Sequence, residues 1–385
     1  MTRTLEILDR LVAFPTVSRD SNLDLINWVQ TLLVDAGFQV TRIWSPDRTK
    51  AGLFARIGPA VDGGICLSAH TDVVPIAGQN WTRPAFALSE DGDRLFGRGT
   101  TDMKGFLASA LAMAERARQE KLSSPLSLSI SYDEEIGCVG IQQMMPELRE
   151  LIGTPRLVIV GEPTSMQVAT GHKGKTALNV TCHGQAGHSA LAPDFVNAIH
   201  VAADVISKMR DLQDQLKSGP VDHDYSIPYS TVHMGKISGG TALNIVPSET
   251  MIAMEFRHLA HTPADEIESE IYKIAASVSQ RYSSATPVSV EVVNAYPGLD
   301  IETTKPIVKW ACEITGQRKT TKVPFGTEAG FFSGLGLDTI VVGPGDMATD
   351  GHKPDEGLAK SELISCDRIM DQICSNLRGD GRLIA

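Results

Sequence analysis

The sequence predicts an α/β protein with a mostly parallel mixed sheet flanked by helices, into which a smaller α+β sandwich is inserted. Three observations support this fold class. Stretches such as "GGICLSAH" and "RLVIVGEP" are almost continuously apolar, as are strands buried on both faces of a parallel sheet. Strands of this kind alternate with helical segments, which is typical of parallel sheets. From about residue 176 the pattern changes to the order βαββαβ, which is typical of a compact α+β sandwich.

The larger domain begins with two amphipathic helices, expected over residues 3–14 and 23–36. The strands "GFQVTRI" and "GLFARI" follow, and "GGICLSAH" comes next. A helix that begins near Met103 leads to the strand "PLSLSISY", and a helix over residues 138–150 leads to "RLVIVGEP". Helices therefore separate the last three of these strands, as in a parallel arrangement.

The smaller domain has its own pattern of strands and helices. "KTALNVTCHG", "STVHMGKISGG", "SETMIAMEFRH" and "PVSVEVV" are expected as strands, and "DFVNAIHVAADVISKMRDL" as a helix. A second helix is expected after Thr262, with that residue as its N-cap and Pro263 at its first position.

The pattern of the larger domain resumes near residue 293. A helix is expected over residues 305–315, then the strand "DTIVVGPG" and a closing helix over residues 360–377. We therefore expect one discontinuous domain around an insertion, with the three parts 1–175, 176–292 and 293–385.

The composition favours a small-molecule partner. The formal net charge is -11 and Lys and Arg form no cluster, whereas a nucleic-acid site needs a basic face. The segment "MTRTLEILDRLVAF" lacks the apolar run of a signal peptide, and no stretch reaches the roughly 18 apolar residues of a membrane span. The six cysteines are scattered without a CxxC pair, which indicates free thiols in a reducing cytoplasm. Cysteine ligation of a metal is therefore disfavoured.

Histidine and acidic residues follow several of the predicted strands or lie in turns between them. They are His70, Asp72, Asp102 (in "GRGTTDMKG"), Glu134, Glu135, Glu162 and His352 (in "DGHKPDE"). Taken singly, each has an ordinary structural reading, such as a loop histidine or an N-cap aspartate. Ligands of open α/β sheets, however, gather at the carboxyl ends of the strands. So many carboxylates in one place require a compensating cation or large upward pKa shifts.

A metal would supply that cation. Two histidines, several carboxylates and no cysteine suit Zn²⁺ best, with Co²⁺ or Mn²⁺ as alternatives. A catalytic zinc needs three protein ligands and a water, so a larger ligand set suits two metals that share one carboxylate.

Seven motifs then occur in one order along the chain: "SAHTDVVP", "GRGTTDMKGFLA", "DEE", "GEPT", "GQAGHSA", "LNIVPSE" and "GHKPDE". In this order they resemble the dinuclear zinc amidohydrolases of the acetylornithine deacetylase and succinyl-diaminopimelate desuccinylase family, which also contains aminoacylases and zinc carboxypeptidases. The resemblance covers essentially the whole chain. It implies a zinc-peptidase-like catalytic domain, an inserted dimerisation domain and hydrolysis of the amide bond of an N-acyl amino acid.

The resemblance also implies roles for the ligand-type residues. Asp102 bridges two metals, His70 and Glu162 complete one metal site, and Glu135 and His352 complete the other. The expected cofactors are two Zn²⁺ ions per subunit, with Co²⁺ or Mn²⁺ as alternatives.

Two further acidic residues are implied to act without binding metal. Asp72 orients the imidazole of His70, as a ligating histidine requires. Glu134 is the general base, which takes a proton from the attacking water and later delivers it to the leaving amine.

The "DEE" segment raises a geometric condition. Adjacent residues of a regular strand face opposite sides, so Glu134 and Glu135 reach one site only if the chain leaves the strand there. Gly137 permits such a turn. Asp133 is expected to serve local hydrogen bonding.

The inserted domain is implied to contribute to catalysis. His188 in "GQAGHSA" is expected to reach the active site of the partner in a homodimer and stabilise the oxyanion, although its ordinary reading is a turn histidine. Asn244 and Arg257 match substrate-contact positions, with Arg257 suited to a carboxylate, and both also have structural readings. Gly326 and Thr327 match another substrate loop.

The expected substrate is N2-acetyl-L-ornithine. "GEPTS", "HKGK", "GTEAGFF" and "VVGPGDMATDGHKPDE" are most similar to the acetylornithine deacetylase branch. Glu328 is expected near the side-chain amine of the substrate and Arg257 near its carboxylate, on grounds of charge complementarity. The alternatives are N-acetyl-diaminobutyrate, N-acetylcitrulline, the substrates of general aminoacylases, desuccinylation and cleavage of a dipeptide. The branch further implies arginine biosynthesis, the cytoplasm and a homodimer formed through residues 176–292.

Two other classes of protein have less support. A non-catalytic, metal-stabilised binding protein would have lost a ligand or the base, and here every such position is filled. A serine hydrolase needs a GxSxG motif, and the nearest segment, "GHSAL", lacks the final glycine.

Overall fold

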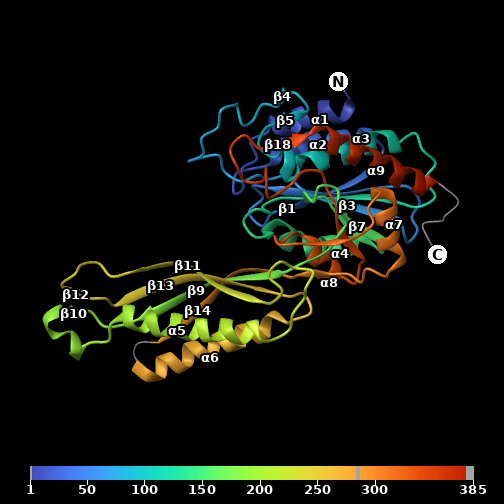
Figure 1. The fold of residues 1–385 in the computed structure, drawn as a ribbon. Helices are drawn as coiled ribbons and strands as arrows, with labels where there is room; N and C mark the ends of the chain where they lie inside the picture. Colours follow the sequence, from blue (N-terminus) through green and yellow to red (C-terminus); the bar gives the residue numbers. More distant parts are fainter. Residues whose placement is uncertain (1, 283–286, 379–385) are drawn as a thin grey trace. The chain divides into compact units, whose positions relative to one another are not determined.

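The computed structural model of the protein describes residues 2–282 and 287–378. These residues form two compact units, each with its own hydrophobic core (Figure 1). The first unit takes its described residues from Met1–Gly171, Leu299–Val323 and Thr327–Ala385, and the second from His172–Gly298 and Pro324–Gly326. The second unit is thus an insertion in the first. Their assignment as catalytic and dimerisation domains stays a prediction.

Nine strands among the described residues form the main sheet of the first unit, in the order β1-β2-β6-β3-β7-β17-β8-β15, with β16 paired to β8. The strands are β1 (Gln39–Trp44), β2 (Ala51–Ile57), β3 (Ile65–His70), β6 (Leu126–Ser131), β7 (Leu157–Val160), β8 (Ala169–His172), β15 (Leu299–Asp300), β16 (Thr321–Val323) and β17 (Thr339–Val341). The central strands β6, β3, β7 and β17 are parallel neighbours, whereas β1 and β2 are antiparallel to theirs. The predicted class of an α/β mixed sheet flanked by helices is confirmed.

Helices cover both faces of this sheet. They are α1 (Arg3–Val12), α2 (Leu23–Asp35), α3 (Gly105–Ala117), α4 (Val139–Ile152), α7 (Pro306–Thr315), α8 (Ala329–Gly334) and α9 (Lys360–Arg378). In Figure 1, α1, α2, α3 and α9 lie on one face of the sheet, and α4 and α8 lie on the other. Thr2 begins α1 by accepting a hydrogen bond from the backbone N–H of Leu5, as an N-cap does.

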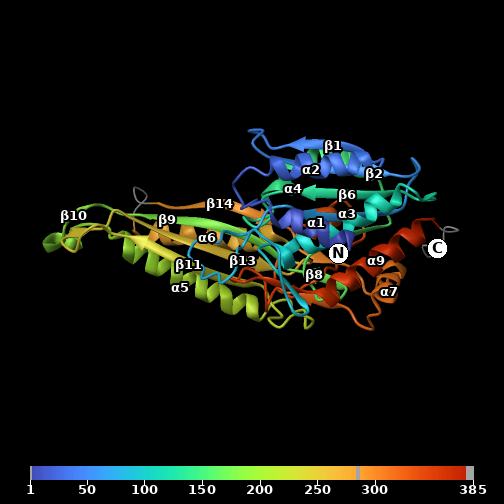
Figure 2. The same ribbon diagram turned by 90° about the horizontal axis from the view of Figure 1, so that it is seen from above.

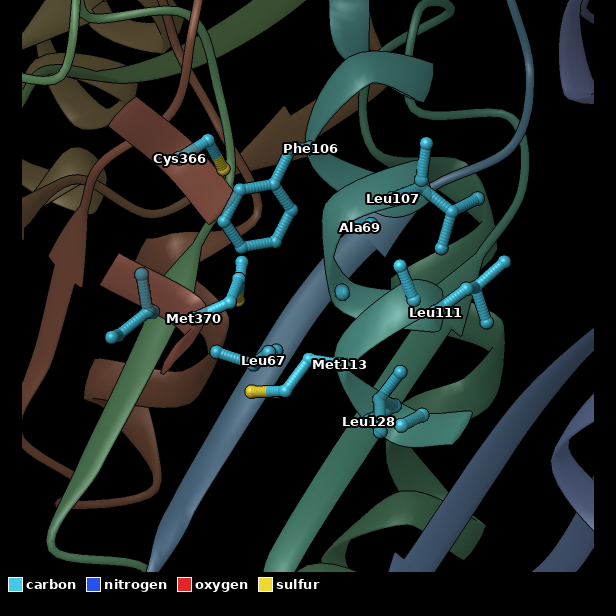
Figure 3. Close-up of a cluster of buried hydrophobic side chains, with 14 of the residues drawn as sticks. Leu67, Ala69, Phe106, Leu107, Leu111, Met113, Leu128, Cys366 and Met370 are labelled. Carbon is cyan, nitrogen blue, oxygen red and sulfur yellow. The ribbon is translucent and has the colours of Figure 1, made fainter. Parts of the chain in front are cut away.

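The core of the first unit lies between the sheet and α3 with α9. Every residue of β3, β6 and β7 is buried, which explains the almost continuously apolar sequences of β3 and β7, whereas β6 alternates leucine or isoleucine with buried serine. Helix α3 is buried over nearly its whole surface because it packs against α1, α9 and the sheet. Figure 3 shows part of this core, formed by Leu67 and Ala69 on β3, Phe106, Leu107, Leu111 and Met113 on α3, and Cys366 and Met370 on α9.

A second, small sheet was not predicted. It consists of β4 (Ser89–Asp91), β5 (Arg94–Phe96) and β18 (Gly357–Ala359), each of three residues and too short to show a pattern in the sequence. Strand β18 pairs with β5 and so joins two segments about 260 residues apart in the chain.

The second unit is a four-stranded antiparallel sheet in the order β11-β13-β9-β14. Its strands are β9 (Gly174–His183), β11 (Thr231–Gly239), β13 (Glu249–His258) and β14 (Val288–Tyr296), and its helices are α5 (Ala198–Lys217) and α6 (Ala264–Tyr282). Both helices pack against one face of the sheet. In Figure 1 and Figure 2, α5 runs alongside the strands of this sheet. Strands β9 and β13 alternate between buried and less buried residues, as expected for a sheet with one covered face.

The described chain order β9-α5-β11-β13-α6-β14 is the predicted βαββαβ order, with two short strands added. These are β10 (Gly187–His188) and β12 (Ile245–Val246), which pair with each other. A short helical turn, Ser189–Asp194, follows β10.

The predicted N-cap of α6 is wrong. The helix begins at Ala264, and the hydroxyl of Thr262 is buried without a hydrogen-bond partner. Thr262 instead lies in the turn before the helix, where its N–H donates to the carbonyl of Leu259.

The helices of residues 2–282 and 287–378 are each too short or too polar to cross a lipid bilayer.

Candidate metal centre

Two overlapping groups of ligand-type side chains lie in the first unit. One group is His70, Asp102 and Glu162, and the other is Asp102, Glu135 and His352. In each group, one potential ligand atom per residue lies within 4.8 Å of the others. Asp102 belongs to both groups.

The first group forms at the carboxyl ends of two strands. His70 is the last residue of β3 and Glu162 follows β7 by two residues, and because β3 and β7 are parallel neighbours their ends meet. His70 Nε2 lies 3.1 Å from Asp102 Oδ1 and 3.6 Å from Glu162 Oε1. These three residues are at most 3% exposed, and Glu162 Oε1 has no hydrogen-bond partner.

The second group is held by turns. His352 Nε2 lies 2.8 Å from Glu135 Oε2 and 3.1 Å from Asp102 Oδ2. The side chain of Glu135 is 5% exposed, whereas that of His352 is 50% exposed. Asp102 lies in the turn Thr100–Lys104 that precedes α3.

Both groups fit a divalent metal ion. Imidazole nitrogens and carboxylate oxygens are the ligands that Zn²⁺ takes in catalytic sites. A buried carboxylate oxygen without a hydrogen bond, as in Glu162, is costly unless an ion pairs with it. Burial raises the pKa of Glu162 well above its ordinary value, and the charge of Asp102 raises it further. A divalent cation would supply the positive charge that this cluster of carboxylates lacks.

The pKa values of the second group couple metal binding to proton release. Burial, together with the charge of Asp102, raises the pKa of Glu135 to about 7. Hydrogen bonds with Asp102 and Glu135 raise the pKa of His352 to about 10. Because a ligating histidine must be neutral, metal binding here has to release the proton of His352.

Asp72 connects the first group to the "DEE" turn. Its backbone carbonyl lies 3.0 Å from His70 Nδ1 and its Oδ1 lies 3.5 Å from the same atom. The same carboxylate accepts the backbone N–H of Glu134 at 3.0 Å and that of Glu135 at 3.3 Å. Ser18 donates a further hydrogen bond to it at 2.6 Å. One buried carboxylate thus faces a ligating imidazole and fixes the turn that carries two other acidic residues.

The chain leaves strand β6 at Ser131, just before the "DEE" segment. Asp133 has a φ of +53° and Gly137 a φ of +105°, so the segment forms a turn and is not extended. The Asp133 carboxylate pairs with Lys50 Nζ at 2.6 Å from each oxygen, and both side chains are largely buried. The geometric condition for Glu134 and Glu135 is therefore met, and Asp133 has the local bonding expected of it.

The side chain of Glu134 lies outside both ligand groups. Its Oε1 accepts a hydrogen bond from Cys138 Sγ at 3.3 Å. Burial raises the pKa of Glu134 well above its ordinary value, against the lowering effect of His70. A raised pKa makes a carboxylate a stronger base, which suits a group that takes a proton and later returns it.

Glu328 and Thr327 lie in the first unit with partners of their own. Glu328 is 1% exposed, and its two oxygens accept hydrogen bonds from Ser131 Oγ at 2.5 Å and Ser68 Oγ at 3.4 Å. Burial raises the pKa of Glu328 to about 7. Thr327 Oγ1 accepts the N–H of Ala329 at the start of α8. Substrate contact by either residue stays a prediction. The burial of Glu328 does not support contact between this residue and a substrate.

The other predicted substrate contacts lie in the second unit. His188 is exposed at the end of β10, and Asn244 is exposed next to β12, where its carbonyl accepts the N–H of Ser189. Arg257 on β13 donates from Nε to Glu255 Oε1 at 2.9 Å. Gly326 lies against the ring of Tyr296, which a Cβ would approach to 2.2 Å. The structure describes these four residues within their own unit, and their catalytic or substrate roles stay predictions.

Two residues around the site were not singled out from the sequence. Glu356 and Arg98 form a buried ion pair of 2.7 Å beside the Asp102 turn. Both lie inside motifs that carry predicted site residues, "GHKPDE" and "GRGTTD". Their place in these motifs is the feature of the sequence that could have identified them.

Comparisons with known proteins show the family and the fold of the chain. A family model described as Peptidase family M20/M25/M40 matches residues 66–376. The acetylornithine deacetylases of Shigella sonnei (strain Ss046) and Klebsiella pneumoniae (strain 342) are each 34% identical to the chain, over 92% and 96% of it and over the same shares of their own lengths. The M20 family metallo-carboxypeptidase Sso-CP2 from Sulfolobus solfataricus has a similar structure, with a TM-score of 0.80 over 97% of this chain and 99% of its own, at 17% identity. At that identity the structural likeness shows the fold alone.

Proposed function

The chain belongs to peptidase family M20/M25/M40 and is a metal-dependent amidohydrolase, and we propose that its substrate is an N-acyl amino acid, first of all N2-acetyl-L-ornithine. The products would be L-ornithine and acetate. The observation that carries the proposal is the pair of ligand groups that share Asp102, beside a carboxylate, Glu134, that belongs to neither. The acetylornithine deacetylases that match nearly the whole chain support the choice of substrate.

The ligand groups are proposed to hold two Zn²⁺ ions, with His70 and Glu162 at one, Glu135 and His352 at the other, and Asp102 between them. Two such ions act as Lewis acids on the acyl carbonyl and lower the pKa of water. Asp72 keeps the ring of His70 in place, since its carbonyl and carboxylate both face Nδ1.

Glu134 is the proposed general base. Its carboxylate takes a proton from the attacking water and delivers it to the nitrogen of the leaving amine, so that one residue serves both halves of the reaction. The raised pKa of Glu134 suits a group that has to hold this proton between the two steps. Asp72 positions it through the hydrogen bond to its backbone N–H.

The second unit is proposed to form a homodimer. Strand β11 lies at the edge of its sheet, and exposed edges are available for pairing with another chain. Ile237 on this strand and the nearby Leu243 and Ile245 expose large apolar side chains. The family resemblance motivates His188 as an oxyanion-stabilising donor and Asn244 and Arg257 as substrate contacts. A place in arginine biosynthesis and a cytoplasmic location rest on the same resemblance.

A substrate screen tests the proposal. The protein, reconstituted with Zn²⁺ or Co²⁺, is incubated with N-acetyl derivatives of ornithine, diaminobutyrate, citrulline and methionine, with N-succinyl-diaminopimelate and with dipeptides. Release of acetate with the highest kcat/KM on N2-acetyl-L-ornithine supports it. Free amino acids from both sides of a dipeptide, with no acetate from any N-acetyl substrate, would instead identify a dipeptidase.

A further inference from the structure

The carboxylate of Glu356 collects hydrogen bonds from the loop that carries Asp102. Oε1 accepts the backbone N–H groups of Thr101 at 2.9 Å and Asp102 at 3.0 Å. Oε2 accepts the backbone N–H of Gly99 at 2.9 Å and Nη1 of Arg98 at 2.7 Å. One buried carboxylate therefore binds four donors drawn from five consecutive residues.

The backbone beside Glu356 holds the same loop. The N–H of Gly97 donates to the carbonyl of Glu356 at 3.0 Å, and Thr101 Oγ1 donates to the carbonyl of Gly357 at 2.9 Å. Gly357 is also the first residue of β18 and lies opposite Phe96 of β5. The pairing of these short strands thus brings Glu356 to the loop, and its side chain then fixes the course of the loop.

Arg98 extends these contacts toward His352. Its Nη1 donates to the carbonyl of Lys353 at 3.3 Å, and its Nη2 donates to Gln79 Oε1 at 2.5 Å. Gln79 Nε2 in turn donates to the carbonyl of His352 at 2.9 Å. His352 and the residue that follows it, Lys353, are therefore connected through Gln79 and Arg98 to Glu356 and the loop of Asp102.

The two ligand groups depend unequally on this arrangement. In the first group, His70 and Glu162 are placed by strands β3 and β7, so only Asp102 depends on the loop. In the second group, both Asp102 and the half-exposed His352 lie on the segments that Glu356 joins. A change at Glu356 is therefore expected to displace two of the three ligands of the second group.

We propose that Glu356 is a positioning residue that sets the separation of Asp102 and His352, and thereby the affinity of the second group for its metal. The inference rests on the proposed function, since it presumes that both groups bind metal. A purely structural ion pair would need only Arg98 as a partner. The three backbone N–H groups on the loop of Asp102 are what a positioning role requires and a simple pair does not.

The test is a metal titration of the Glu356→Gln variant. Gln keeps the size of Glu, but one of its two acceptors becomes an NH₂ group, so two of the four donors lose their acceptor whichever way the amide turns. Asp367→Asn is the matched control, because Asp367 is a partly buried carboxylate on α9 that accepts a hydrogen bond from Thr4 and lies outside both ligand groups. Co²⁺ absorption and competition with a chromophoric chelator resolve the two binding steps, and circular dichroism of the metal-free proteins checks the fold.

The second binding step is taken as metal binding at the second group, and in Glu356→Gln it is expected to weaken by about 10–100-fold, the usual effect of losing a residue that supports a metal ligand. The first step should weaken less, and Asp367→Asn should bind as the wild type does. Equal weakening of both steps, or none, would overturn the positioning role. A wild type that binds fewer than two metals would overturn the dinuclear proposal itself, before any variant is compared.

Gln79→Ala decides the matter if Glu356→Gln does not fold. Gln79 is only half-buried, so its loss leaves the core intact. The substitution removes the bridge in which Gln79 accepts from Arg98 and donates to the carbonyl of His352. Weakening confined to the second step supports the inference. Unchanged binding in both steps overturns it.

Discussion

Replacing Glu134 with glutamine and replacing its neighbour Glu135 with glutamine should affect turnover and metal content differently. Glu134→Gln is expected to stop turnover with metal content intact, whereas Glu135→Gln is expected to release one metal. Glu134 accepts a hydrogen bond from Cys138 and belongs to neither ligand group. Glu135 Oε2 lies 2.8 Å from His352 Nε2, inside the second group.

The sizes of the two effects follow from these contacts. A general base contributes about 10²–10⁴-fold to rate, which at 1.36 kcal/mol per tenfold is about 3–5 kcal/mol of transition-state stabilisation. Glutamine keeps the shape of Glu134 and removes only its proton chemistry, so kcat should fall by that factor. At Glu135 the same change replaces a charged ligand of the second group, so metal content should fall from about two ions per chain toward one.

The assay combines metal analysis with kinetics on one preparation. Both variants are purified in parallel, dialysed against the same Zn²⁺ buffer and compared by elemental analysis, by kcat on the best substrate of the screen and by circular dichroism. Loss of metal from Glu134→Gln with retention in Glu135→Gln would mean that the roles are exchanged. Equal rate losses with full metal content in both would refute the division of roles.

Three further predictions concern stability and the second unit. Lys50→Met should lower the free energy of unfolding by about 3–5 kcal/mol, because it leaves the largely buried carboxylate of Asp133 without its 2.6 Å partner. In urea titrations of the metal-free protein, Lys50→Met/Asp133→Asn should recover most of this loss, and a single-variant loss below about 1 kcal/mol would contradict the reasoning. Burial lowers the pKa of His172 to about 4, below its ordinary 6.5, so the unfolded chain takes up the proton first as pH falls. About 3 kcal/mol of stability should therefore be lost as pH falls from 6.5 to 4, and the difference between wild type and His172→Phe should show this slope. His188→Ala should lower kcat by about 10²–10³-fold with metal content unchanged, and an unaffected kcat would remove its oxyanion role.

The part of the site that the sequence predicts best is the part that strands place. His70 is the last residue of one buried apolar strand and Glu162 follows another, and such strands are recognisable from composition alone. Because β3 and β7 are parallel neighbours, the rule that strand ends converge brings these two side chains together. The turn at the "DEE" segment was also predicted. Adjacent residues of a strand face opposite sides, so Glu134 and Glu135 can reach one site only if the chain leaves the strand there.

Glu356 shows what sequence reasoning could not reach. Three of its four donors are backbone N–H groups, which nearly every residue carries, so its partners leave no mark in the sequence. The strands that bring it to the loop of Asp102 are three residues long. Glu328 is a related case, since its charge suggested a substrate amine and the structure places it among Ser131 and Ser68.

The position of β17 has a consequence for synthesis of the chain. This strand lies between β7 and β8 in the sheet, although β7 precedes the inserted unit, β8 ends at its first residue and β17 follows it. A ribosome must therefore translate the whole insertion before β7 acquires its second neighbour, and until then an apolar strand edge of the host unit stays unpaired. The inserted unit, by contrast, has all four strands of its sheet once Tyr296 has emerged. The demand for chaperones during translation should therefore come from the host unit, whose sheet is completed last.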